Sequence, residues 1–297
     1  MTDTNWAFAQ YENVRKRLPA SNARGACKRV PNLGALAEDF DVFLFDAYGV
    51  LNVGTTPIAS APARVAALQS MGKRALVLTN GASFPASDRL PKYRQYGFNF
   101  AAEDVISSRD ALAVHLAAVP NIHWAAMAPK NASFEGLGVR FDLLEDAPET
   151  YVRAEGFLLL GSQIWNDERQ AMLVETLRAH PRPVLVGNPD LVAPYEHGFS
   201  LQPGLYAHWL ADKIGLEPQF FGKPFGGMFA EAARRFADVP PERVLMIGDT
   251  LHTDILGGAA AGFKTLLVEN HGMFRGADVL PYIEKSGIAP DYITPTI

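Results

Sequence analysis

Two stretches of this chain place carboxylates directly after apolar runs, where they could do chemistry. Asp46 follows "VFLF", and a carboxylate there could act as a nucleophile or as a metal ligand. Asp249 follows "VLMIG", and Asp254 comes five residues later. Two such acids repel each other unless a cation or a proton lies between them, and hard oxygen ligands of this kind suit Mg²⁺. These residues therefore indicate a metal site.

Two further stretches carry groups that could interact with an anion. Thr79 and Asn80 follow "ALVL", and Gly81 opens the turn, where side-chain donors and backbone N–H groups suit phosphate oxygens. Lys223 lies before Pro224 at the start of a helical pattern, where a solvated surface lysine would be equally ordinary. Each stretch alone is also explained by turn or capping chemistry, so the interpretation depends on their combination.

The elements that must position these residues alternate between strands and helices. Eight short apolar runs predict strands: "VFLF", "ALVLT", "DVIS", "HWAAM", "GFLLLG", "PVLVG", "RVLMIG" and "KTLLVE". Periodic stretches such as "SAPARVAALQSMG" and "DERQAMLVETLRAH" lie between them and predict helices. This alternation indicates an α/β protein with a parallel sheet covered on both faces. Ligands of such sheets bind beyond the carboxyl ends of the strands, where the polar stretches stand.

Composition bounds the class of protein. The 297 residues are 48% hydrophobic and 20% charged, which is typical of one large or two smaller globular domains. The net charge of −5 gives no support for a nucleic-acid partner. No apolar run is long enough to cross a bilayer, and the N-terminus lacks the order of a signal peptide, so a cytoplasmic enzyme is expected. Cys27 is the single cysteine, which excludes an internal disulfide.

The order of the motifs (acid, Thr-Asn, Lys, acid pair) resembles the haloacid dehalogenase (HAD) superfamily, most of whose members are Mg²⁺-dependent phosphatases. "GVLNVGTTPIASAPARVAALQSMGKRALVLTNGAS" resembles the first half of the core in its class IIA branch, the p-nitrophenylphosphatase-like enzymes. "LVGNPDLVAPYEHGFSLQPGLYAHWLADKIGLEPQFFGKPFGGMF" and "GDTLHTDILGGAAAGFKTLLVENH" resemble the second half. The resemblance covers roughly residues 40–271 and implies a Rossmann-like core of the HAD fold with an inserted α/β cap domain of the C2 type.

We expect three parts along the chain. Residues 1–39 form an N-terminal helical extension, residues 40–111 and 216–297 form the HAD core, and residues 112–215 form the inserted cap. The stretch between Pro120 and Gly204 supports the insertion, because it has its own strand–helix alternation and several Pro and Gly breaks. Caps of this class often pair, so the resemblance allows a homodimer.

The resemblance implies a role for each motif. Asp46 would attack phosphorus and form an aspartyl-phosphate, while Lys223 would offset the crowded negative charge. Mg²⁺ would be held by Asp46, the backbone carbonyl of Tyr48 and Asp249, with Asp254 supporting the metal site. The groups expected to hold phosphate oxygens are Thr79, Asn80 and Gly81. The cap loop "GNPDLVAPYEHG" supplies four candidate substrate contacts: Asn188, Asp190, Tyr195 and His197.

One position departs from the family pattern. Typical members read Asp-x-Asp-Gly, and the second Asp is the general acid, but this chain has Asp46-Ala47-Tyr48-Gly49. A phenol with a pKa near 10 is a poor proton donor at neutral pH. The substrate could therefore have a good leaving group, such as an acyl phosphate. Alternatively another group supplies the proton, with His252 the nearest in sequence, although a surface helix histidine is the competing interpretation.

Two other functions stay open at this point. "FDAYGVL" resembles the first motif of the 2-haloacid dehalogenases, which use no Mg²⁺, but the acid pair fits a metal-dependent member. A non-catalytic protein that binds a phosphorylated metabolite is the other alternative, although binding alone would not require Asp46. The expected function is a Mg²⁺-dependent phosphohydrolase of a small phosphorylated metabolite, atypical because of Tyr48.

Overall fold

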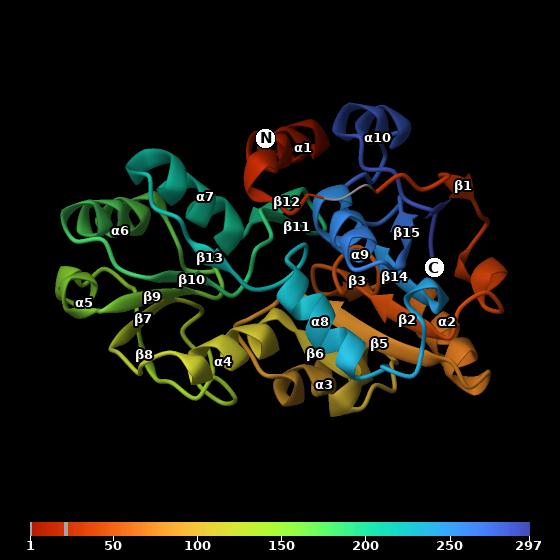
Figure 1. Cartoon of the computed structure of the whole chain (residues 1–297), viewed down its shortest axis with the longest axis horizontal. Helices are drawn as coiled ribbons and strands as arrows, with labels where there is room; N and C mark the ends of the chain where they lie inside the picture. Colours follow the sequence, from red (N-terminus) through yellow and green to blue (C-terminus); the bar gives the residue numbers. More distant parts are fainter. Residues whose placement is uncertain (1, 21–22) are drawn as a thin grey trace.

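A parallel seven-stranded sheet forms the larger part of the molecule in the computed structural model, which describes residues 2–20 and 23–297 (Figure 1). Its strand order is β1-β16-β15-β14-β2-β5-β6, and every neighbouring pair is parallel. The strands are β1 (Lys28–Arg29), β2 (Val42–Phe45), β5 (Arg74–Thr79), β6 (Val105–Ser107), β14 (Val244–Gly248), β15 (Lys264–Val268) and β16 (Tyr292–Thr294). The predicted parallel α/β fold is confirmed.

Helices cover both faces of this sheet, because its central strands are apolar on both sides. In β2, Phe43 and Phe45 pack with α2 (Ala61–Ser70) and with Tyr93 of α3 (Ala86–Gln95). The alternate residues of β2 pack on α8 (Gly226–Arg234). Such two-sided burial is what a parallel sheet requires, and it explains the unbroken apolar run "VFLF". The remaining helices beside this sheet are α9 (Leu256–Ala260) and α10 (Leu280–Ser286).

A second parallel sheet, of five strands, is built from the middle of the chain and appears in green at the left of Figure 1. Its order is β13-β10-β9-β7-β8. The strands are β7 (Trp124–Met127), β8 (Phe141–Leu143), β9 (Gly156–Leu159), β10 (Val184–Val186) and β13 (Gln219–Phe220). Its helices are α4 (Ser108–Ala118), α5 (Pro148–Arg153), α6 (Asp167–Ala179) and α7 (Pro203–Ile214).

The two sheets bear on the expected division into domains. The smaller sheet keeps pairing up to Phe220, four residues beyond the point where the core segment was expected to resume. The exact domain boundaries stay a prediction. Two hairpins lie outside both sheets: β3 (Asn52–Val53) with β4 (Thr56–Pro57), and β11 (Val192–Pro194) with β12 (Phe199–Leu201).

The N-terminal helix α1 (Thr4–Asn13) packs against the rest of the chain through one buried face. Asp3 caps it by accepting a hydrogen bond from the Trp6 backbone N–H. Phe8 and Tyr11 are buried, and the hydroxyl of Tyr11 accepts a hydrogen bond from the Leu191 N–H at 3.2 Å. No helix among the described residues is long and apolar enough to cross a membrane.

Candidate active site

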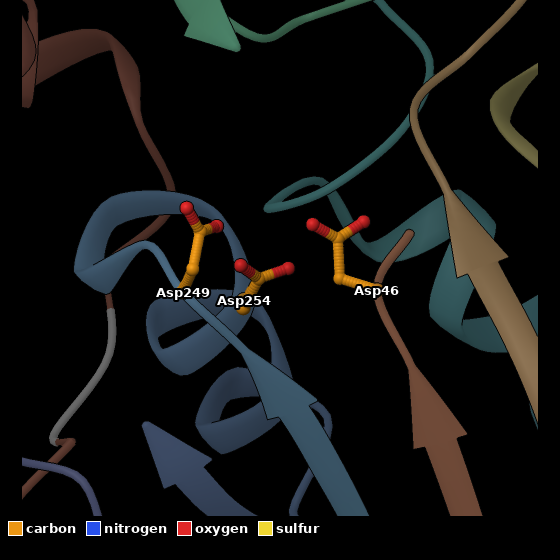
Figure 2. Close-up of side chains that lie close together, drawn as sticks. All are labelled: Asp46, Asp249 and Asp254. Atoms are coloured by element: carbon orange, nitrogen blue, oxygen red, sulfur yellow. The ribbon is translucent and has the colours of Figure 1, made fainter. Parts of the chain in front are cut away.

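Neighbouring strands bring the catalytic candidates together. β2 and β14 pair in register, Phe45 opposite Ile247, and the Asp46 N–H continues the ladder by donating to the Ile247 carbonyl at 2.9 Å. Asp46 and Asp249 therefore leave adjacent strands at the same edge of the sheet. Figure 2 shows the two side chains beyond the ends of their strands, with Asp254 between them. One ligand oxygen from each of the three carboxylates, here named the carboxylate cluster, lies within 4.8 Å of the others.

Local backbone geometry makes this approach possible. Gly49 has a φ of +79°, and a Cβ at that position would lie 2.6 Å from Asp249 Oδ2. Glycine thus allows the turn after Tyr48 to pass directly against the Asp249 carboxylate. Asp254 sits on a π-helical turn, Leu251–Ile255, and its Oδ2 accepts a hydrogen bond from the Thr250 N–H at 3.1 Å. Such turns are frequent at functional sites.

Lys223 is the cation of the carboxylate cluster. Its side chain is almost fully buried, and Nζ lies 2.6 Å from Asp46 Oδ1 and 2.7 Å from Asp254 Oδ1. Burial opposes the charge, but the carboxylates of Asp254 and Asp46 outweigh it and raise the pKa of Lys223 above its usual value. Lys223 is therefore protonated and holds the two acids together.

One lysine does not compensate the three carboxylates of the cluster. Burial raises the pKa of Asp46, although Lys223 opposes the shift. Burial and then the nearby Asp254 raise the pKa of Asp249 to about 7, against hydrogen bonds from the Thr250 hydroxyl and the Met273 N–H. A divalent cation would relieve this repulsion, and the donors are the hard oxygens that Mg²⁺ prefers. The residues present therefore fit the metal.

Asn80 has a different environment from the one expected of a phosphate ligand. Its Nδ2 donates to the Lys223 carbonyl at 2.9 Å and to Asp190 Oδ1 at 2.8 Å. Its Oδ1 accepts from the Lys223 N–H at 2.7 Å. Its amide group is thus used to hold the backbone of Lys223 in place, and a direct contact of its side chain with phosphate stays a prediction.

A cavity of about 550 Å³ opens above the carboxylate cluster, between the two sheets. Most of the residues predicted for the site line it: Asp46, Tyr48, Thr79, Gly81, Asn188, Asp190, Tyr195 and Asp249. Four others do not line it: Asn80, Lys223, Asp254 and His197. Lys223 and Asp254 act from beneath through their ion pair, whereas His197 is exposed and does not reach the cavity.

The cap loop supplies an acid and an aromatic ring to this cavity. Tyr195 stacks on Tyr48 with ring centroids 6.4 Å apart and an interplanar angle of 18°. Burial raises the pKa of Asp190 to about 6, while Lys223 and Asn80 oppose the shift. Asn188 accepts the Asp190 N–H at 3.0 Å and donates to Gln202 at 3.2 Å, which is the turn chemistry typical of Asn-Pro-Asp.

His252 is not placed to serve as the missing acid. It is fully buried, so its interpretation as a surface helix histidine is wrong. Its ring stacks on Tyr11, and its Nε2 lies 2.5 Å from Glu12 Oε1, both in helix α1. Burial lowers its pKa, although Glu12 opposes the shift. It does not line the cavity and serves to anchor the N-terminal helix.

Two basic residues of the cavity escaped the sequence-based prediction. Arg89 and Lys92 lie on α3, the helix that follows the Thr79 turn, and both line the cavity. The sequence offered one signal: the two residues are three apart, which places them on one side of the helix that follows the turn at residues 79–81.

Comparisons with known proteins identify the family. A haloacid dehalogenase-like hydrolase model matches residues 43–133, and a HAD-hydrolase-like model matches residues 220–297. A human glycerol-3-phosphate phosphatase is 28% identical over 296 residues, covering 89% of this chain and 90% of the relative. The chain belongs to the haloacid dehalogenase-like hydrolase superfamily. Within this superfamily, the relatives of the chain support its assignment to class IIA. Because these relatives are named phosphatases, the chain is a hydrolase, and the non-catalytic alternative is wrong.

Solved structures agree with this HAD assignment. A possible sugar phosphatase of the HAD superfamily from Cytophaga hutchinsonii has a TM-score of 0.81 at 24% identity, covering 91% of this chain and 98% of its own. At that identity the likeness shows the fold alone. A glycerol phosphate phosphatase from Mycobacterium tuberculosis, solved in complex with magnesium, has a TM-score of 0.67 at 26% identity, covering 87% of this chain and 75% of its own.

Proposed function

We propose that this HAD hydrolase is a Mg²⁺-dependent phosphohydrolase of a small phosphorylated metabolite. The observation that carries the proposal is the convergence of Asp46, Lys223 and Asp249 beneath one cavity. The human relative's name and the magnesium complex of the mycobacterial relative support the substrate class and the metal. The ligands of Mg²⁺ would be Asp46, Asp249 and the Tyr48 carbonyl, and the ion would neutralise charge on the phosphoryl group.

Asp46 has one oxygen held and one free, as a nucleophile requires. Lys223 binds Oδ1 at 2.6 Å, so Oδ2 is the atom that attacks phosphorus. The bond from phosphorus to the leaving oxygen then breaks, and an aspartyl-phosphate forms. Water attacks this phosphorus next, which releases inorganic phosphate and restores the Asp46 carboxylate. The Thr79 hydroxyl, in the cavity lining, holds a phosphate oxygen during both steps.

The leaving oxygen needs a proton that Tyr48 does not supply. Burial raises the pKa of the Tyr48 phenol to about 12, which makes it a still poorer acid than a free tyrosine. Asp190 is better suited, because its carboxyl lines the cavity and its pKa is raised to about 6. We assign the proton transfer to Asp190, with Asn80 orienting the carboxyl group by donating from Nδ2 to Asp190 Oδ1.

The dehalogenase alternative has less support than the phosphatase. A metal-free dehalogenase would need one nucleophilic acid, whereas here Asp249 and Asp254 each have an oxygen within 4.8 Å of one of Asp46. Asp249 forms no ion pair among the described residues, and a bound cation would supply one.

A substrate screen tests the proposal. Phosphate esters, acyl phosphates and 2-haloacids are each incubated with the protein, in Mg²⁺ or in chelator, and phosphate and halide are measured. We expect phosphate release that requires Mg²⁺. Halide release in chelator would overturn the proposal, as would phosphate release at an unchanged rate without metal.

A further inference from the structure

One wall of the cavity carries two positive charges that the proposed chemistry does not use. Arg89 and Lys92 project from α3 into the lining, three residues apart on the same helix face. Both are half-buried. Burial and then the neighbouring Arg89 lower the pKa of Lys92, which indicates that the two cations crowd each other. We refer to them as the basic pair.

Gly81, in the turn that follows Thr79, leaves room for the Arg89 side chain. Gly81 does not have a left-handed φ, so its backbone conformation does not require glycine. A Cβ there would lie 2.5 Å from Arg89 Nη1 and 2.7 Å from Nη2. The guanidinium therefore occupies the space that a side chain at position 81 would take, next to the turn that begins at Thr79.

Arg89 is held in place but not neutralised. Its Nε and Nη2 both donate to the Phe84 carbonyl at 3.3 Å, whereas Nη1 has no acceptor among the described residues. Within the same part of the chain, neither Arg89 nor Lys92 forms a salt bridge. The ammonium of Lys92 lies 5.7 Å from the ring centroid of Tyr48 and 5.3 Å from that of Tyr96.

The acids of the cavity are not the partners of the basic pair. Asp46 is bound by Lys223, Asp249 by Thr250 and Met273, and Asp190 by Asn80. Asp88 also lines the cavity, but it is exposed and forms no ion pair with Arg89. The cavity thus has an acidic end whose carboxylates are bound by other groups. It also has a basic wall with no carboxylate partner among the described residues, which fits a ligand with negative charge at two points.

We propose that Arg89 and Lys92 bind a second anionic group of the substrate, so that the preferred substrates are phosphate monoesters carrying a carboxylate or a second phosphate. This inference rests on the proposed function, because the first phosphate must occupy the Asp46 end. The guanidinium offers paired N–H donors to an oxyanion, and the ammonium adds a point charge.

A matched substrate pair tests the proposal. 3-Phosphoglycerate and glycerol 3-phosphate differ by a carboxylate in place of a hydroxymethyl group. We expect kcat/KM to favour 3-phosphoglycerate by roughly ten- to a hundredfold, as for a charge-assisted hydrogen-bond pair. Arg89→Met and Lys92→Met should each reduce this ratio, because each lowers kcat/KM for 3-phosphoglycerate more than for glycerol 3-phosphate. Arg94→Met, an exposed position on the same helix, is the control and should keep the ratio.

The alternatives give different results. Equal losses on both substrates in Arg89→Met and Lys92→Met would overturn the proposal and place the cations on the transferred phosphate. An unchanged ratio in both variants, with normal melting temperatures, would also overturn it. Fructose 1,6-bisphosphate against fructose 6-phosphate asks whether a phosphate replaces the carboxylate as the second anion, and a preference abolished by the same variants supports the proposal.

The proposed function can fail separately from this inference. If the wild type releases phosphate from neither substrate, the proposed function loses its support. Calorimetric titration of the Asp46→Asn variant with 3-phosphoglycerate and glycerol 3-phosphate then decides the inference. Tighter binding of the carboxylate, lost on adding Arg89→Met, supports it, and equal affinities overturn it.

Discussion

The two charged regions of the cavity differ in how they are held. The carboxylate cluster follows β2 and β14, central strands of the larger sheet, and its charges are fixed by Lys223 and by backbone N–H groups. The basic pair lies on α3, outside the sheet, and has no carboxylate partner among the described residues. The sheet thus fixes the groups proposed for chemistry, and a covering helix carries those proposed for selection.

The largest effect should come from the nucleophile. Asp46→Asn removes the attacking oxygen while keeping the shape of the side chain, so turnover of every phosphate ester should fall by at least about 10⁴-fold. Initial rates and a melting curve check this. Asp88→Asn, which changes an exposed acid of the same cavity, is the control and should retain most activity. If Asp46→Asn kept the wild-type rate, the assignment of Asp46 as the nucleophile would be wrong.

The loss of unfolding free energy should be larger when the buried ion pair is broken than when an exposed one is broken. Lys223→Met leaves Asp46 and Asp254 buried without their cation, and we expect the free energy of unfolding to fall by roughly 3 kcal/mol. Lys264→Met breaks a half-exposed pair with Asp291 and should cost at most about 1 kcal/mol. Urea unfolding in chelator measures both. Equal losses would mean that burial does not distinguish the two pairs.

Adding Mg²⁺ sharpens this test. A cation bound to the cluster compensates the same carboxylates, so Mg²⁺ should raise the unfolding midpoint of Lys223→Met more than that of Lys264→Met.

Several residues of the candidate site could be predicted from the sequence, because each follows an apolar run whose end marks the end of a strand. The eight predicted strands are all present, and parallel pairing places Asp46 and Asp249 at one edge. Two kinds of feature gave no such signal. Strands of two or three residues, such as β1 and β13, are too short to show a period. The hydrogen bonds of Asn80 to Lys223 join positions 143 residues apart.

The environment of His252 was unpredictable for a related reason. Its position two residues before Asp254 indicated a site residue or a surface helix, but its burial depends on α1, which comes from the far end of the chain. Arg89 likewise acquires significance only because Gly81 leaves space beside it. Side-chain partners distant in sequence are set by tertiary packing, which local patterns do not encode.

Position 48, where this chain has Tyr48 in place of the general acid of the family, offers a gain-of-function test. Tyr48→Asp restores the general acid of the family pattern, and we expect turnover of alkyl phosphates to rise at least tenfold, within the roughly hundred- to ten-thousandfold worth of general acids. Tyr48→Phe is the matched control, because a phenol with a pKa of about 12 donates no proton, so its rate should stay near that of the wild type. A Tyr48→Asp variant that folds, binds Mg²⁺ and gains nothing would count against this account.

The smallest effect concerns Asp190 and depends on the leaving group. Its pKa of about 6 means that the donating form is lost as pH rises through 6, so alkyl phosphate turnover should fall above that pH. Asp190→Asn should lower that turnover by about tenfold and flatten the profile, while p-nitrophenyl phosphate, whose leaving group needs no proton, should change little. Equal effects on both substrates would exclude a role in proton donation.

The central claim is that Asp46, Lys223 and Asp249 form one metal-dependent centre for phosphoryl transfer. A crystal structure with Mg²⁺ and beryllium fluoride, which mimics an acyl phosphate, tests it most directly. The account predicts the fluoride adduct on Asp46 Oδ2, Lys223 still on Oδ1, and a single Mg²⁺ ligated by Asp46 and Asp249. An ion bound away from these two carboxylates, or an adduct on another residue, would contradict it.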